Sequence, residues 1–148
     1  MRQMSLFEFT PASSDSEAVG LAGLMPAVRA AMNRVAGSDP EGRKLLVDKI
    51  NAVASREAIA LTRSGAKSIS KPTLDKWLQT SDKEHTPSLE GILCFCLAAG
   101  DASPIKPFLS CLGLVAISEE DLGYVRLGKA QKMLKNAKEE FKKAEAGV

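Results

Sequence analysis

The chain has 148 residues and a net charge of +2, from 20 Lys and Arg against 18 Asp and Glu. Its length suits one domain with a helical appendage, and its hydrophobic content of 45 % is that of a globular protein. No apolar run reaches the ~18 residues that a membrane span requires, and the start lacks a signal-peptide pattern. Three cysteines, an odd count, favour reduced thiols over a disulfide framework. We therefore expect a cytoplasmic protein with no membrane partner.

Glycine, proline and small polar residues divide the first half of the chain. Residues 1–17 are expected to form a flexible N-terminal arm, and residues 18–36 a first helix that stops at Gly37. Ser38-Asp39-Pro40 is typical of an N-cap followed by proline in the first turn, so a second helix should run from Pro40 into the fifties. Either that helix continues through Ser55, or Ser55 caps a new helix. In both cases Gly65 ends the segment.

The same punctuation recurs in the second half. Ser70 caps a short helix over 70–78, Thr86-Pro87 opens one that stops at Gly100, and Ser103-Pro104 opens one that stops at Gly113. Ser118, followed by three acids, opens a last helix that runs to about residue 144. Residues 114–117 are the one candidate for a short strand. The expected fold is therefore all-α with six to seven helices: a helix-turn-helix domain over 18–117 and a long C-terminal helix over 118–148.

The segment over 56–76 carries a local excess of positive charge, with five basic residues against two acids. A helix that enters the major groove needs small polar residues at its N-terminus, an apolar inner face and a polar outer face. Leu74, Trp77 and Leu78 provide the apolar face by their spacing. Small polar and basic residues crowd the helix start and its outer face, namely Ser68, Ser70, Lys71, Thr73, Lys76 and Gln79.

The stretch Ile-Ser-Lys-Pro-Thr-Leu-Asp-Lys-Trp-Leu, residues 69–78, resembles the recognition helix of phage-repressor-like helix-turn-helix proteins. Residues 87–113 extend the similarity to phage CII-type regulators, so that it covers about residues 40–117. The resemblance implies a regulator of transcription, of phage or prophage type, that binds duplex DNA through a short recognition helix over residues 70–79. It implies DNA contacts from Ser70, Lys71, Thr73, Lys76 and Gln79, to which we add Arg63, Lys67 and Ser68 from the preceding turn.

The turn before this helix departs from the usual pattern, because nine residues separate Gly65 from Leu74. Either the turn carries an insertion, or Gly65 is not the turn glycine. Asp75 also adds an acid to the polar side of the helix. The alternative interpretation is a plain helical hairpin whose lysines are only solvated.

The C-terminal helix carries a heptad pattern. Small and large apolar residues alternate in steps of three and four along it: Leu127, Ala130, Leu134, Ala137, Phe141 and Ala144. Five cations and no acid lie between residues 126 and 138. We expect a homo-oligomer that forms through Leu127, Leu134, Ala137 and Phe141. The alternatives are a basic arm that binds DNA and a helix that packs on its own domain.

The N-terminal arm suggests a different class of function, a module that docks on a protein partner. Gln3-Met4-Ser5-Leu6-Phe7 resembles the pentapeptide by which bacterial replication and repair proteins bind the sliding clamp. Gln3, Leu6 and Phe7 would make that contact. The alternative is an arm that packs Leu6, Phe7 and Phe9 on the core or on a neighbouring chain.

The sequence offers no catalytic constellation. His85 is the only histidine and has no nucleophile beside it. Cys94 and Cys96 are two residues apart on an expected helix, so they point to different sides and suit neither a disulfide nor a metal site. We expect no enzyme activity, no catalytic residue, no metal and no cofactor.

Overall fold

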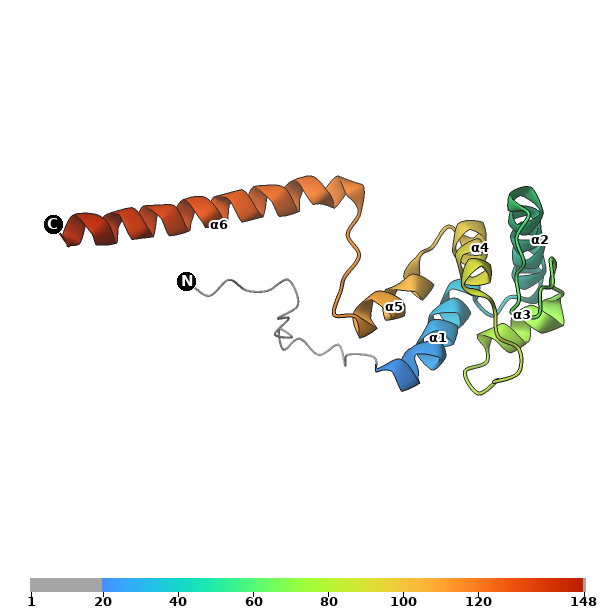
Figure 1. Ribbon diagram of the computed structural model, residues 1–148. Coiled ribbons are helices and arrows are strands. Elements are labelled where there is room, and N and C mark those ends of the chain that lie inside the picture. Colours follow the sequence, from blue (N-terminus) through green and yellow to red (C-terminus); the bar gives the residue numbers. More distant parts are fainter. Residues whose placement is uncertain (1–19, 148) are drawn as a thin grey trace. The chain divides into compact units, whose positions relative to one another are not determined.

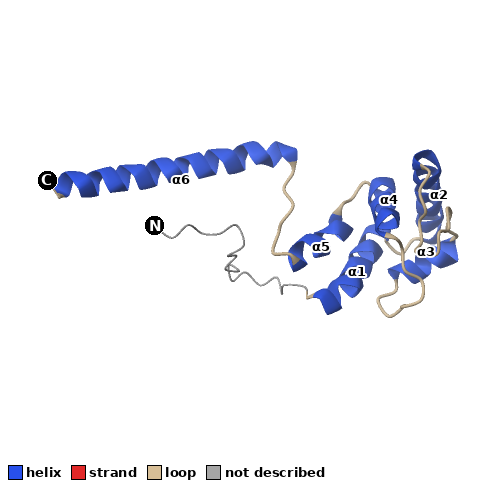
Figure 2. Cartoon of the chain, viewed as in Figure 1, coloured by secondary structure: helices blue, strands red, loops and turns tan. Residues whose placement is uncertain are grey.

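A computed structural model of the chain describes residues 20–147. It divides into two units, one that ends at Val115 and one that begins at Ala116. Within the described residues every regular element is helical, apart from one isolated bridge between Thr62 and Pro87, so the all-α fold is confirmed (Figure 1, Figure 2). The N-terminal arm, with Gln3, Leu6 and Phe7, lies outside the described residues.

The helices follow the predicted order. The first unit contains η1 (Leu21–Gly23), α1 (Leu24–Ala36), α2 (Pro40–Glu57), α3 (Lys71–Leu78), α4 (Leu89–Ala99), η2 (Ser103–Ile105) and α5 (Lys106–Cys111), and the second contains α6 (Glu119–Ala146). The side chains of Asp39, Ser70 and Ser118 cap α2, α3 and α6, each by accepting a hydrogen bond from a backbone N–H three residues on. None of the described helices is long and apolar enough to cross a membrane.

The largest correction concerns the end of α2. The helix passes through Ser55, which caps nothing, and ends at Glu57, eight residues before Gly65. Ala58 closes it in the left-handed conformation, with φ at 54°. The chain then leaves the helix because buried Leu61 uses its backbone elsewhere: its N–H donates to Ala66, and its carbonyl accepts from Ser88. Local helix propensity is overridden by these tertiary bonds.

Two smaller corrections concern loops. The fourth helix begins at Leu89 with Ser88 as its cap, because Pro87 forms the bridge with Thr62 instead of opening the helix. Residues 114–117 are not a strand. All four are exposed, and within the described chain they pair with no other strand.

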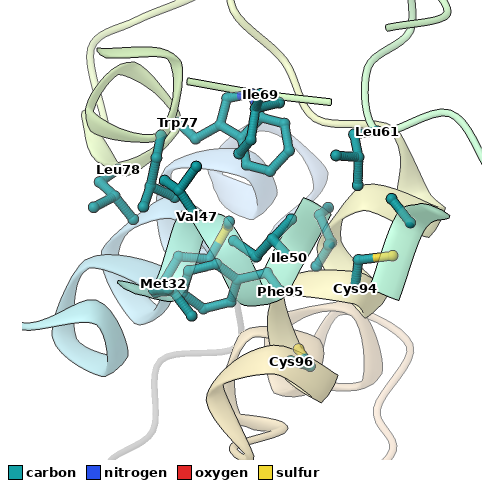
Figure 3. Packing of buried hydrophobic residues seen from close by; sticks show 14 of the residues in the cluster. Met32, Val47, Ile50, Leu61, Ile69, Trp77, Leu78, Cys94, Phe95 and Cys96 are labelled. Carbon is teal, nitrogen blue, oxygen red and sulfur yellow. The ribbon is translucent and has the colours of Figure 1, made fainter. Parts of the chain in front are cut away.

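The core of the first unit lies among α1, α2, α3 and α4, with α2 and α4 in extensive contact. Figure 3 shows Trp77 and Leu78 of α3 lying over Met32 of α1 and Val47 of α2. Trp77 is fully buried, as expected of a core anchor. The outer face of α3 is therefore fixed by the burial of its inner face.

The second unit is α6 alone, and none of its side chains is buried. Three of its large apolar residues, spaced seven apart, are more than half exposed, with Leu127 at 55 %, Leu134 at 57 % and Phe141 at 64 %. An isolated helix gains most of its stability in water from packing an apolar face against a partner. An exposed apolar stripe of this kind is typical of surfaces that bind a protein partner.

Candidate nucleic-acid interface

Helix α3 presents a polar outer face because its other face is sealed in the core. Leu74, Trp77 and Leu78 are at most 4 % exposed. Lys76 and Gln79 are exposed, and Thr73 is half-buried on the same side. Ser70 is exposed at the N-cap, where its hydroxyl accepts the N–H of Thr73 at 3.4 Å. The structure thus brings together the N-terminal and outer-face residues that the sequence singled out.

The long turn over 58–70 is an ordered element that is anchored to the helices on both sides. The Asn51 side chain of α2 accepts the N–H of Ile69 at 2.8 Å and donates to its carbonyl at 2.9 Å. Ile69 itself is 8 % exposed. These two bonds lie immediately before the cap of α3. The extra length of the turn therefore carries exposed Arg63, Lys67 and Ser68 outward, while both ends of the turn stay fixed.

A hollow of about 320 Å³ separates this turn from the loop that follows α3. Thr73 and the buried Trp77 form one wall of it. The remaining lining is polar and mostly basic or hydroxyl-bearing: Thr62, Arg63, Ser64, Lys83, Glu84, His85 and Thr86. Arg63 and Thr73 thus meet at one hollow, whereas Lys67 and Ser68 do not line it.

Asp75, the acid on α3, is neutralised within the chain. Its carboxylate accepts from Arg43 of α2 at 2.9 Å and from Lys71 at 2.9 Å. The hydrogen bond from Lys71 is the largest influence that holds the pKa of Asp75 below its ordinary value, and burial opposes it. Lys71 is thereby engaged at the edge of the helix and is less free than Lys76 to meet a phosphate.

We expect Asp75→Asn to lower the free energy of unfolding by about 1 kcal/mol near neutral pH, the value of two partly exposed ion pairs. Because the folded-state pKa is depressed, the contribution of Asp75 is present above its unfolded value of 3.8 and is lost as pH falls through the folded pKa. The difference between the two proteins should therefore vanish in acid. Urea unfolding over a pH series measures it, and a difference that persists at the acid end would contradict the assignment.

The C-terminal end of α3 is held by a buried cation that sequence reasoning missed. Arg29 of α1 is 2 % exposed, and its Nη1 donates to the carbonyls of Lys76 at 2.9 Å and Trp77 at 3.0 Å. Its Nη2 donates to the carbonyl of His85 at 2.8 Å. Burial lowers the pKa of this guanidinium, and nearby Asp82 opposes the shift. Arginine stays charged at neutral pH, so it satisfies the orphan carbonyls at the negative end of the helix.

The loop after α3 is organised around His85, the residue that the sequence placed beside no nucleophile. His85 is half-buried: its Nδ1 lies 3.2 Å from Asp82 Oδ2, and its Nε2 lies 3.3 Å from Lys76 Nζ. One neutral tautomer satisfies both contacts, with Nδ1–H donating to Asp82 and Nε2 accepting from Lys76. The backbone N–H of His85 also donates to Asp82, the main cause of that carboxyl's lowered pKa. Lys76 thus meets an imidazole rather than a carboxylate.

The cysteines are packing residues. Cys94 and Cys96 are buried, and burial raises the pKa of both thiols, so neither is an activated nucleophile. Cys111 is half-buried, and its Sγ contacts the Phe108 carbonyl. Over residues 20–147 no group of three or more His, Cys, Asp or Glu side chains is placed to hold a metal ion.

Of the residues that shape this surface and were not predicted, only Arg29 carried a signal in the sequence. Arg29 interrupts the apolar run Ala27-Val28-Arg29-Ala30-Ala31-Met32. A single charged residue within such a run indicates a side chain that is buried with a partner. Asn51 and Arg43 lie on α2 and act across 18 and 32 residues, respectively. No spacing rule connects such distant partners.

Comparisons with known proteins add no relative: no family model, no curated protein and no solved structure significantly matches the chain.

Proposed function

We propose that the protein is a DNA-binding regulator of transcription, of phage or prophage type, that contacts duplex DNA through the outer face of α3. The observation that carries the proposal is the orientation of α3. Its apolar side is buried, and Asp75 forms an ion pair with Arg43. Its outward side presents Thr73, Lys76 and Gln79. A short helix with a free polar N-terminus and one sealed face is the form that major-groove recognition requires.

The surrounding cations supply the affinity in this proposal. Arg63 and Lys67 lie on the turn before α3, and Lys83 lies on the loop after it, all of them exposed. Lys/Arg contacts to phosphates dominate non-specific binding and make it salt-dependent. Ser70 and Thr73 at the helix start, with Gln79 at its end, would position the helix or contact base edges. Lys71 contributes less because Asp75 holds it.

The wider proposal follows from this role. The protein acts in the cytoplasm, where DNA of a phage or prophage is transcribed. It acts as a homo-oligomer, because two recognition helices can engage two half-sites of one operator.

Binding of a fluorescent duplex of about 30 bp, followed by anisotropy over a salt series, tests the proposal. The double variant Arg63→Ala/Lys76→Ala should weaken binding about tenfold or more at low salt and reduce the salt slope by about 2. Arg34→Ala/Lys106→Ala is the matched control. It also removes one Arg and one Lys, both exposed, from a hollow formed by α1, η2 and α5, and it should leave binding unchanged.

Two outcomes contradict the proposal. One is an absence of duplex binding at low salt, since even sequence-specific proteins bind DNA non-specifically there. The other is an equal loss in the two double variants, which would assign binding to overall charge rather than to α3.

A further inference from the structure

The exposed stripe of α6 is regular enough to define its partner. Large residues recur every seven positions, at Leu127, Leu134 and Phe141, and all three are more than half exposed. Alanines recur at Ala130, Ala137 and Ala144. In heptad terms every large residue occupies one of the two core positions and every alanine occupies the other. An apolar stripe with a period of 3.5 residues fits another helix with the same period.

The strict separation of large and small residues indicates the orientation of that partner. In a parallel, in-register pair, like positions meet, so layers of two large residues would alternate with layers of two alanines. The alanine layers would then leave voids, each of which costs stability. In an antiparallel pair the two core positions face each other, so every layer holds one large residue and one alanine. All layers then have similar thickness, and the helices can pack closely along their length.

The distribution of charge along α6 also favours the antiparallel orientation. Between residues 126 and 138 α6 carries five cations and no acid, whereas residues 139–145 carry three acids and two cations. A parallel pair would bring each of these cations level with its own copy. In the antiparallel register that sets Leu134 against Ala137, residues 126–132, with a net charge of +3, lie level with residues 139–145 of the second copy, with a net charge of −1. Opposite charges at the same level favour this arrangement over one that aligns like charges.

We propose that α6 pairs with α6 of a second copy of this chain as an antiparallel two-stranded coiled coil. Its layers are Leu127 with Ala144, Ala130 with Phe141, and Leu134 with Ala137. The pairing specifies the oligomer contact in the proposed function but does not depend on DNA binding. It sets the two Glu119 ends about 50 Å apart at a rise of 1.5 Å per residue, so the two DNA-binding units are attached at opposite ends of the coil.

Association is measured first, by sedimentation velocity of the full chain without DNA. The wild type should sediment as a dimer, and Leu134→Glu should sediment as a folded monomer, because the buried hydrophobic core of the first unit is made of residues between Val28 and Cys96. Asn136→Glu adds the same charge two residues away, off the stripe, and should remain dimeric. A wild type that is monomeric at high concentration, as when α6 folds back on its own chain, overturns the proposal. So does a Leu134→Glu variant that still associates.

Orientation is measured on the same dimer by the distance between two spin labels. Glu119→Cys places a label at the start of α6 in a Cys111→Ser background, where the two remaining cysteines are buried. The expected distance is about 50 Å. A parallel pair would bring the labels within about 25 Å, since paired helices pack 8–10 Å apart, and that result would overturn the antiparallel assignment. Neither measurement involves DNA, so failure here and failure of the DNA-binding proposal are separate results.

Discussion

Arg29→Met should lower the free energy of unfolding by about 3 kcal/mol or more. The substitution keeps an apolar stem of similar length but removes the donors that satisfy the carbonyls of Lys76, Trp77 and His85. A buried acceptor left without a partner costs about 1–3 kcal/mol, and at least the Trp77 contact is fully buried. The end of α3 and the loop that returns to α4 depend on the same guanidinium, so both should loosen together.

Chemical denaturation measures this effect, with Arg34→Met as the control. Arg34 lies on the same helix but is exposed, so its replacement should change stability by less than about 0.5 kcal/mol. Arg29→Lys should fall between the wild type and Arg29→Met, because an ammonium keeps the charge but lacks the planar fork that reaches both groups of carbonyls. Equal stability of Arg29→Met and the wild type would show that water replaces the guanidinium at no cost.

The elements that the sequence predicted well are those defined by short-range chemistry. Asp39, Ser70 and Ser118 are caps because a side-chain oxygen three residues before a free N–H can close the first turn. The buried face of α3 follows from the spacing of Leu74 and Trp77 alone. These signals do not depend on the rest of the fold.

The elements that the sequence missed are defined by partners far along the chain. The end of α2 is one case. Residues 56–61 favour a helix, but Leu61 is buried in the core and its carbonyl accepts a hydrogen bond from the N–H of Ser88. Arg29 is another, since nothing near it in the chain shows that its partners lie beyond residue 75. The candidate site is affected in the same way, because Asp75 pairs with Arg43, 32 residues before it, whereas its pair with Lys71 is an i, i+4 contact within α3.

Gly91→Ala should also destabilise the protein by about 3 kcal/mol, although alanine is the better helix former by about 1 kcal/mol. A Cβ at this position would lie 2.3 Å from the carbonyl oxygen of Leu61. That oxygen cannot simply move, because it accepts the N–H of Ser88 at 2.9 Å, while the Ser88 hydroxyl donates to the Ala60 carbonyl at 2.9 Å. The missing side chain of Gly91 is what lets the turn over 58–70 lie against the start of α4.

The matched control is Gly128→Ala in the middle of α6, where nothing lies within 4 Å of the added Cβ and helix stability should rise by about 1 kcal/mol. In Gly91→Ala, amide hydrogen exchange should become faster in residues 58–70, the turn that carries Arg63 and Lys67, and not evenly over the core. Under the proposed function, DNA affinity should then fall even where the variant remains folded, because α3 and the basic turn would no longer be held in one surface. A stable variant with unchanged exchange in this turn would show that the close approach of α4 is not what positions it.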